Sequence, residues 1–215
     1  MTPYNLVNMA KILGLDIIAL TDHNTCRNCE AAIKAGQSIG LTVVPGMELC
    51  TSEEVHVVCL FENSEDAMKF SDCVLSSIPP IKNRADIFGE QLIMDETDNV
   101  IGTQELLLTT ASSISIENVK SIVGSYGGAC FPAHIDRSSY SVISNLGMIT
   151  PEMNFSAVEL AEKDKLAEYE EKYPIIKNMK KIFDSDAHYL ENMREATNII
   201  SLPSCSAKSL IEFLK

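Results

Sequence analysis

Short apolar runs alternate with segments of helical spacing along this chain, and the alternation limits its fold more than any other feature. We expect strands at 16–20, 41–49, 54–61, 128–134, 155–161, 181–188 and 197–202. We expect helices at 3–13, 27–40, 64–78, 85–94, 103–113, 115–127, 166–173 and 206–215. Because strands that alternate with helices usually form parallel units, this order predicts an α/β fold with a parallel sheet or barrel.

Size and charge narrow the classes of function. The 215 residues suit one domain, which we expect to span 1–215. Lys and Arg number 17 against 30 Asp and Glu, which gives a net charge of −13. Nucleic acids and anionic membranes attract basic surfaces, so this charge argues against both as partners, single nucleotides excepted. The seven cysteines follow no signal peptide, and we expect reduced core thiols in a cytoplasmic protein.

The middle of the chain departs from the alternation. From about 64 to 120 we expect an elaborated helical connection within the same domain, with a turn or small hairpin at 95–102. This connection contains no internal repeat and no low-complexity linker. We expect it to shape the choice of substrate.

One pair of cysteines has the CxxC spacing that is found in redox and zinc sites. Cys26 and Cys29, in "CRNC", are spaced like a redox pair or half of a zinc site, and they start a predicted helix, where a thiol pKa is lowered. No second CxxC completes a zinc finger. We therefore interpret them as small residues at a helix start.

The four histidines lie in or at the ends of apolar runs. His23, His134 and His188 each close a run, and His56 lies within one, a short turn after Glu48. A single histidine at a strand end is usually an ordinary hydrogen-bonded residue. In α/β folds, however, the carboxyl ends of parallel strands meet on one face. Histidines from distant segments can therefore converge.

Carboxylates accompany these histidines. Asp22 is next to His23, Glu48 closes "VVPGME", and Asp186 is two residues before His188. In extended backbone, residues two apart point the same way, so "DAH" presents a carboxylate and an imidazole together. A mixed set of nitrogen and oxygen ligands suits Zn²⁺, Mn²⁺ or Fe²⁺ and is poor for Ca²⁺. The pattern predicts a metal site at the strand ends.

Five segments resemble the successive motifs of one family. "LGLDIIALTDHNT", "VVPGMEL", "EVHVVCLF", "FPAHID" and "DSDAH" are similar, in order, to motifs of the PHP (polymerase and histidinol phosphatase) superfamily. The resemblance covers most of the chain. It implies a distorted (β/α)7 barrel with up to three divalent metals at the ends of its strands, and hydrolysis of phosphate esters.

The resemblance also implies ligands for two bridged metals. Glu48 resembles the carboxylate that bridges them, and His56 and His134 resemble the imidazoles that complete one of them. Asp186 resembles a ligand of the other.

Further roles follow from the same motifs. His23 and His188 resemble ligands of a third metal. Asp22 adjoins the site, where it could orient a ligand or move a proton. Arg137, three residues after His134, could meet a substrate phosphate with its fork of donors, although a surface arginine in a loop is an equal alternative.

One family motif has no counterpart here. The family opens with His-x-His on a first strand, and this chain has no histidine before His23. We therefore expect the barrel to lack its first strand here and the site to hold fewer than three metals. Two explanations stay open: the sequence is truncated, as a fragment or through a misassigned start, which we favour, or the protein truly lacks this strand.

Two functions remain open. The favoured one is a metal-dependent phosphoesterase that uses a metal-activated water on a small phosphate ester, such as a nucleotide, sugar phosphate or histidinol phosphate. The alternative is a degenerate, non-catalytic PHP-like domain that binds one metal or acts as a scaffold. A proofreading exonuclease module is a third interpretation, which the acidic charge and the absence of a polymerase region disfavour.

Overall fold

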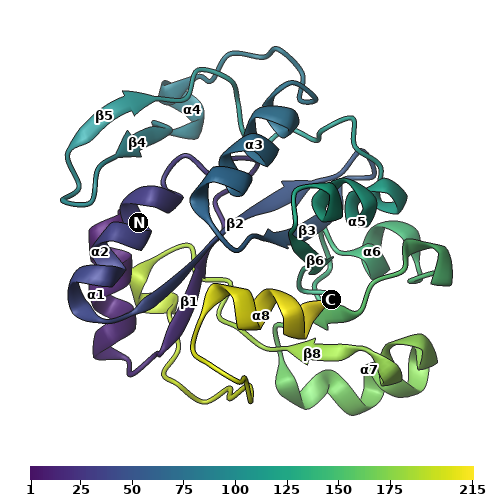
Figure 1. Cartoon of the computed structure of the whole chain (residues 1–215). Coiled ribbons are helices and arrows are strands. Elements are labelled where there is room, and N and C mark those ends of the chain that lie inside the picture. Colours follow the sequence, from purple (N-terminus) through teal and green to yellow (C-terminus); the bar gives the residue numbers. More distant parts are fainter.

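The computed structural model describes residues 1–215 and places a four-stranded sheet at the centre of the molecule, with helices on both of its faces (Figure 1). The strands are β1 (Ile17–Leu20), β2 (Thr42–Cys50), β3 (His56–Leu60), β4 (Leu92–Met94), β5 (Val100–Thr103), β6 (Ala129–Pro132), β7 (Ala157–Glu159) and β8 (Lys180–Ile182). The helices are α1 (Pro3–Ile12), α2 (Cys29–Ile39), α3 (Ser64–Leu75), α4 (Ala85–Phe88), α5 (Ile116–Ser125), α6 (Val142–Leu146), α7 (Leu166–Lys172) and α8 (Ala207–Leu214). Short 3-10 helices are η1 (Pro151–Met153), η2 (Lys163–Lys165), η3 (Pro174–Asn178) and η4 (Leu190–Asn192).

The central sheet has the strand order β1-β2-β3-β6 and mixed directions. β1 and β2 are parallel, whereas β3 is antiparallel to both β2 and β6. The α/β class is confirmed, but the expectation of an all-parallel sheet is wrong. Five residues join β2 to β3, and a connection that short returns the chain antiparallel, because a parallel crossover needs a dozen or more residues. β7 and β8 form a separate parallel pair, and the sheets do not close into a barrel.

β2 lies between β1 and β3 and pairs with each of them over a different part of its length. Its first half pairs with β1 up to Pro45, and its second half pairs with β3 from Gly46 onward. At Gly46 the neighbouring backbone comes so close that a Cβ atom would lie 2.8 Å from the Cys59 carbonyl oxygen. Pro45 and Gly46 thus lie inside one continuous strand, and Glu48, beyond them, has a paired neighbour on each edge: His23 on one and Val58 on the other.

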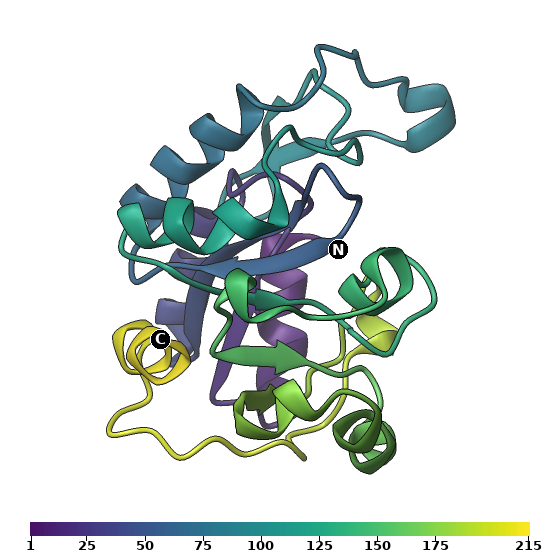
Figure 2. The ribbon, with the colours of Figure 1, turned by 90° about the vertical axis from the view of Figure 1, so that its right-hand side faces the viewer.

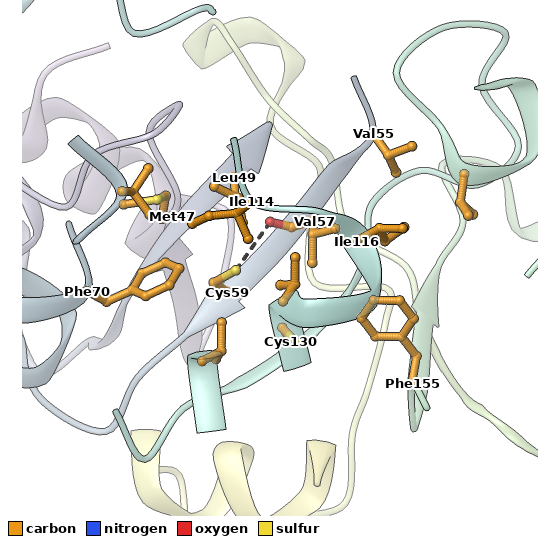
Figure 3. Packing of buried hydrophobic residues seen from close by; sticks show 14 of the residues in the cluster. Met47, Leu49, Val55, Val57, Cys59, Phe70, Ile114, Ile116, Cys130 and Phe155 are labelled. Atoms are coloured by element: carbon orange, nitrogen blue, oxygen red, sulfur yellow. Dashed lines mark hydrogen bonds between the residues drawn. The ribbon is translucent and has the colours of Figure 1, made fainter. Parts of the chain in front are cut away.

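The two faces of the sheet bury different clusters, and β3 shows the alternation. Val57 and Cys59 face the larger cluster, which includes Met47, Leu49 and residues of α3 and α5 (Figure 3). Val58 faces the opposite cluster, which is covered by α8. Figure 2 shows α8 on one side of the sheet and α3 and α5 on the other. Burial on both faces explains why β3 reads as a continuous apolar run.

The connection between α3 and α5 is less helical than expected. The expected helix at 85–94 is wrong beyond α4, because the chain turns at Gly89 and enters β4. The turn or hairpin expected at 95–102 is confirmed as the antiparallel pair β4–β5, which projects from the body of the molecule (Figure 1).

The helix expected at 103–113 is also wrong. Backbone groups of this segment bond to Gln91, whose side-chain amide donates to the carbonyls of Gln104 and Leu106 and accepts from the N–H of Leu108. Side-chain partners in the neighbouring segment therefore replace the bonds that a helix would make.

The last expected strands are short or missing. β7 and β8 each cover three residues of the runs at 155–161 and 181–188. The strand expected at 197–202 is wrong, because this segment pairs with no other strand; Ile200 and Leu202 nevertheless pack against the cluster under α8.

The cysteines are all free. Five of them are buried, as expected, whereas Cys73 is half-buried and Cys205 is exposed. No helix in the chain has both the length and the apolar character that crossing a membrane requires.

Candidate metal centre

Backbone pairing beyond the ends of the strands sets the positions of His23 and Glu48. His23 forms an isolated parallel bridge with Glu48, three residues after β1 ends. The N–H of Glu48 donates to the Asp22 carbonyl at 3.2 Å, and the N–H of Asn24 donates to the Glu48 carbonyl at 3.0 Å. "TDHNT" is therefore an extension of the β1–β2 pairing.

Hydrogen bonds of the Asn24 side chain fix the position of the paired segments that contain His23 and Glu48. It is fully buried and has a left-handed backbone (φ 51°), which asparagine tolerates better than most residues. Its side-chain oxygen accepts from the N–H of Cys50 at 2.9 Å. Its amide nitrogen donates to the carbonyls of Leu108 and Thr110, both at 2.8 Å. The "DHN" sequence thus joins the site to the long connection.

The start of β3 and the segment after β6 bring His56 and His134 next to Glu48. His56 is the first residue of β3 and pairs with Cys50, so it lies at the carboxyl end of β2. The N–H of Ala133 donates to the His56 carbonyl at 3.0 Å, which brings His134 alongside. His134 itself has φ 30°, a left-handed conformation that turns the chain away from the sheet directly after β6.

Three ligand atoms form a nearly equilateral triangle. Glu48 Oε1 lies 3.2 Å from His56 Nδ1 and 3.3 Å from His134 Nε2, and these two nitrogens are 3.3 Å apart. Ligand atoms around a tetrahedral ion with bonds of about 2.1 Å are about 3.4 Å apart. The donor set and its spacing therefore fit one divalent cation.

The second oxygen of Glu48 faces another imidazole. Oε2 lies 3.2 Å from His23 Nδ1, and the ligand atoms of His23, Glu48 and His56 all lie within 4.8 Å of one another. The carboxylate of Glu48 thus lies between the nitrogens of His56 and His134 on one side and Nδ1 of His23 on the other.

The electrostatics favour an ionised Glu48. Burial by itself raises the pKa of Glu48, but hydrogen bonds with His134 and His56 outweigh it and hold the pKa well below its usual range. Burial lowers the pKa of His23, although the Glu48 carboxylate opposes that shift. Deprotonated carboxylate and neutral imidazole are the forms that bind a metal.

Asp186, His188 and Arg137 form a neighbouring group. Asp186 Oδ2 lies 3.0 Å from Arg137 Nη2, and the Asp186 carbonyl lies 3.0 Å from His188 Nδ1. The rings of His188 and His23 have centroids 5.8 Å apart, so this group adjoins the first. Asp186 has φ 42°, and the strand expected through His188 ends at Ile182. The alternation expected for "DAH" therefore does not apply.

Asp22 lies differently from the other candidates. Its Oδ2 accepts from the side-chain amide of Asn28 at 3.2 Å, and Asn28 in turn bonds to the backbone of Leu92 and Met94. Burial raises the pKa of Asp22, and the hydrogen bond from Asn28 partly offsets this. Asp22 is thus joined to the start of α2 and to β4.

Cys26 and Cys29 belong to the core. Both thiols are buried and lie 3.1 and 3.4 Å from the Gly46 carbonyl. Burial raises the pKa of Cys26 well above its usual value, which disfavours the thiolate that redox or metal chemistry needs.

Sequence reasoning missed two residues beside the site. Tyr140 stacks on His56 with ring centroids 4.6 Å apart, and its carbonyl accepts from the His56 N–H at 2.8 Å. Glu159 is a buried carboxylate at the end of β7. An acidic residue inside the apolar run "FSAVELA" was the available signal for Glu159; Tyr140 lies in a loop that carries no comparable signal.

Comparison with known proteins places the chain in a family. The model of the PHP domain matches residues 1–195. The chain belongs to the PHP domain family. Over 63 residues it is 36% identical to an uncharacterised protein of Methanocaldococcus jannaschii, a match that covers 29% of this chain and 36% of that protein.

Solved structures with low sequence identity share the fold. The lesion-specific endonuclease PfuEndoQ of Pyrococcus furiosus matches all of this chain at 14% identity with a TM-score of 0.71, and the chain spans 51% of its length. A Bifidobacterium adolescentis protein, provisionally named a metal-dependent phosphoesterase, matches 91% of this chain at 18% identity with a TM-score of 0.59; 87% of that protein is covered.

Proposed function

We propose that this protein is a metal-dependent phosphoesterase that hydrolyses small phosphate esters. Membership of the PHP family supports a metal-dependent hydrolase. The observation that carries the proposal is the triangle of Glu48, His56 and His134 atoms, whose sides of 3.2 to 3.3 Å match the ligand spacing of one cation.

The residues present would hold the cations in two adjoining groups. Glu48, His56 and His134 would hold one ion, Asp186 would join Glu48 at a second, and His23 would belong with His188 to a further one. Asp186 and His188 complete the proposed ligand set. Mixed imidazole and carboxylate ligands suit Zn²⁺, Mn²⁺ or Fe²⁺. A divalent cation bound there would act as a Lewis acid and lower the pKa of a coordinated water.

Arg137 is the proposed phosphate-binding residue. Its guanidinium is paired with Asp186 at 3.0 Å, and its side chain is 43% exposed. A substrate phosphate can therefore approach the donors that Asp186 leaves free. Because guanidinium and phosphate geometries match, Arg137 would orient the ester and offset its charge.

Asp22 is the proposed proton donor to the leaving group. Burial raises its pKa, so it retains a proton at higher pH than an exposed aspartate. It precedes His23 directly and lies beside the proposed ligands. A neutral carboxylic acid in such a place can protonate a departing alkoxide.

A small substrate and a cytoplasmic location are also proposed. The net charge of −13 disfavours the long polyanion that an endonuclease binds, although the fold is shared with one. Seven cysteines without a disulfide suit a reducing compartment.

Hydrolysis assays with defined metals test the proposal. The purified chain, first stripped of metal, is given Mn²⁺ or Zn²⁺ with p-nitrophenyl phosphate and a panel of mononucleotides and sugar phosphates. We expect metal-dependent phosphate release that Glu48→Gln abolishes and that Glu62→Gln, at an exposed position, leaves intact. No release with any divalent metal would refute the proposal, and cleavage of a DNA duplex alone would refute the small substrate.

The alternative is a non-catalytic PHP-like domain that binds metal or acts as a scaffold. Metal content separates the two, because the proposed enzyme holds at least two ions per chain and the degenerate form holds one or none. Elemental analysis of the purified chain after loading and dialysis measures this ratio.

A further inference from the structure

Two of the four buried side-chain atoms without a hydrogen-bond partner lie beside the proposed metal centre. They are Nδ1 of His134 and Oε1 of Glu159. Their residues are 4% and 2% exposed, so water does not reach them freely. Buried polar atoms without partners are rare in proteins because each one costs the free energy of its lost hydration.

The backbone ties the two residues together. The N–H of Ile135 donates to the Glu159 carbonyl at 2.9 Å, which joins the segment after β6 to the end of β7. The backbone N–H of His134 is close enough to the Glu159 carboxylate to oppose the rise in its pKa. The carboxylate of Glu159 therefore lies next to the backbone of His134.

The two atoms are chemically complementary when a metal is bound. His134 directs Nε2 toward Glu48 and His56, so a cation bound there would take the Nε2 lone pair and leave the ring proton on Nδ1. That N–H needs an acceptor, and ligating histidines usually donate this proton to a carboxylate or carbonyl. Oε1 of Glu159 is a buried acceptor without a donor.

We propose that Glu159 is a positioning residue for the metal centre, whose Oε1 accepts the Nδ1–H of His134 when Nε2 binds the cation. The bond holds the His134 ring in the tautomer and orientation that ligation requires. This role rests on the proposed metal centre, but it concerns the affinity for metal and not the choice of substrate.

The charges around Glu159 agree with this role. Burial, followed by the nearby carboxylate of Asp184, raises the pKa of Glu159 well above its usual range. An N–H donor and a cation on the far side of the imidazole would both stabilise the ionised carboxylate. No lysine or arginine forms an ion pair with Glu159.

Zinc affinity of the full chain tests the role. Dissociation constants are measured by competition with a chromophoric chelator for the wild type, for Glu159→Gln and for Glu159→Asp. Glu162→Gln is the control, because it removes an exposed carboxylate three residues away. We expect Glu159→Gln to bind zinc about 10- to 100-fold more weakly. We expect Glu159→Asp to recover part of the loss and the control to match the wild type.

An NMR measurement gives a second readout that needs no substitution of Glu159. On addition of zinc to the wild type, the Nδ1–H of His134 should become a slowly exchanging, downfield resonance. If Glu159→Gln fails to fold, the wild-type spectrum alone decides, and a rapidly exchanging Nδ1–H would overturn the role. Equal zinc affinity of the wild type and a folded Glu159→Gln would overturn the role alone. Absence of zinc binding to the wild type would overturn the metal centre as well.

Discussion

At the scale of single residues, Glu48 has the central place in the site. Its two carboxylate oxygens contact imidazoles from three different segments, at 3.2 to 3.3 Å. It is buried, so without these partners its charge would be strongly destabilising. The three imidazoles supply these partners.

The pKa of Glu48 predicts how the stability of the metal-free chain depends on pH. Its folded-state pKa lies below the unfolded value of about 4.3. The ionised carboxylate therefore stabilises the fold fully above that pH, and this contribution is lost as the pH falls toward the folded-state pKa. Urea unfolding between about pH 6 and pH 3 should show a smaller loss of unfolding free energy on acidification for Glu48→Gln than for the wild type. Equal pH dependence of the two would contradict the assigned hydrogen bonds, and Glu62→Gln serves as the control.

At the scale of elements, β2 organises both the sheet and the site. It pairs with parallel β1 along one edge and with antiparallel β3 along the other, and Glu48 is paired with His23 on the first edge and with Val58 on the second. The absence of a side chain at Gly46 allows β3 to approach β2 closely.

A matched pair of glycine substitutions tests this organisation. In Gly46→Ala the new Cβ would meet the Cys59 carbonyl oxygen at 2.8 Å and a Leu60 methyl group at 2.6 Å. Overpacking of this kind typically costs about 1–3 kcal/mol of unfolding free energy. Gly124→Ala, within α5 and with no atom within 4 Å of the new Cβ, should instead stabilise by about 0.5–1 kcal/mol. Denaturant unfolding measures both, and a neutral Gly46→Ala would contradict the tight approach.

Particular elements show what the sequence could predict and why the rest needed the structure. The apolar runs in β2, β3 and β6 were recognisable because burial on both faces leaves no polar alternation. The antiparallel direction of β3 could be inferred only from the five residues that connect it to β2. The direction of β6 could not be inferred, because the connection that begins at residue 64 is long enough for either direction. The segment at 103–113 looked helical because its partners, the side chains of Gln91 and Asn24, are distant in sequence.

The candidate site also has features that the sequence could predict and others that needed the structure. Histidines at the ends of apolar runs drew attention to His23 and His134, and the structure brings both to Glu48. The left-handed backbone conformations of His134 and Asp186 set the directions of these two side chains. No local sequence pattern predicts these conformations. Glu159 was not predicted as a site residue because the expected strand continued to Ala161, which placed Glu159 inside the strand. In the structure β7 ends at Glu159.

At the scale of the whole molecule, separate parts of the chain converge on one face. The ends of β1, β2 and β6, the start of β3 and the segment after β8 supply the candidate ligands, while the core clusters lie between the sheet and its helices. Glu48, His56 and His134 therefore lie in or directly after strands of the central sheet, whereas Asp186 and His188 lie on irregular backbone after β8. We expect the first group to bind a cation in the geometry described here.

Anomalous diffraction at the zinc edge, from crystals of the full chain grown with zinc, tests this most directly. We expect a peak at about 2.0–2.2 Å from Glu48 Oε1, His56 Nδ1 and His134 Nε2 together. A zinc peak bound elsewhere, with none among these three atoms, would contradict the metal centre on which the proposed phosphoesterase depends.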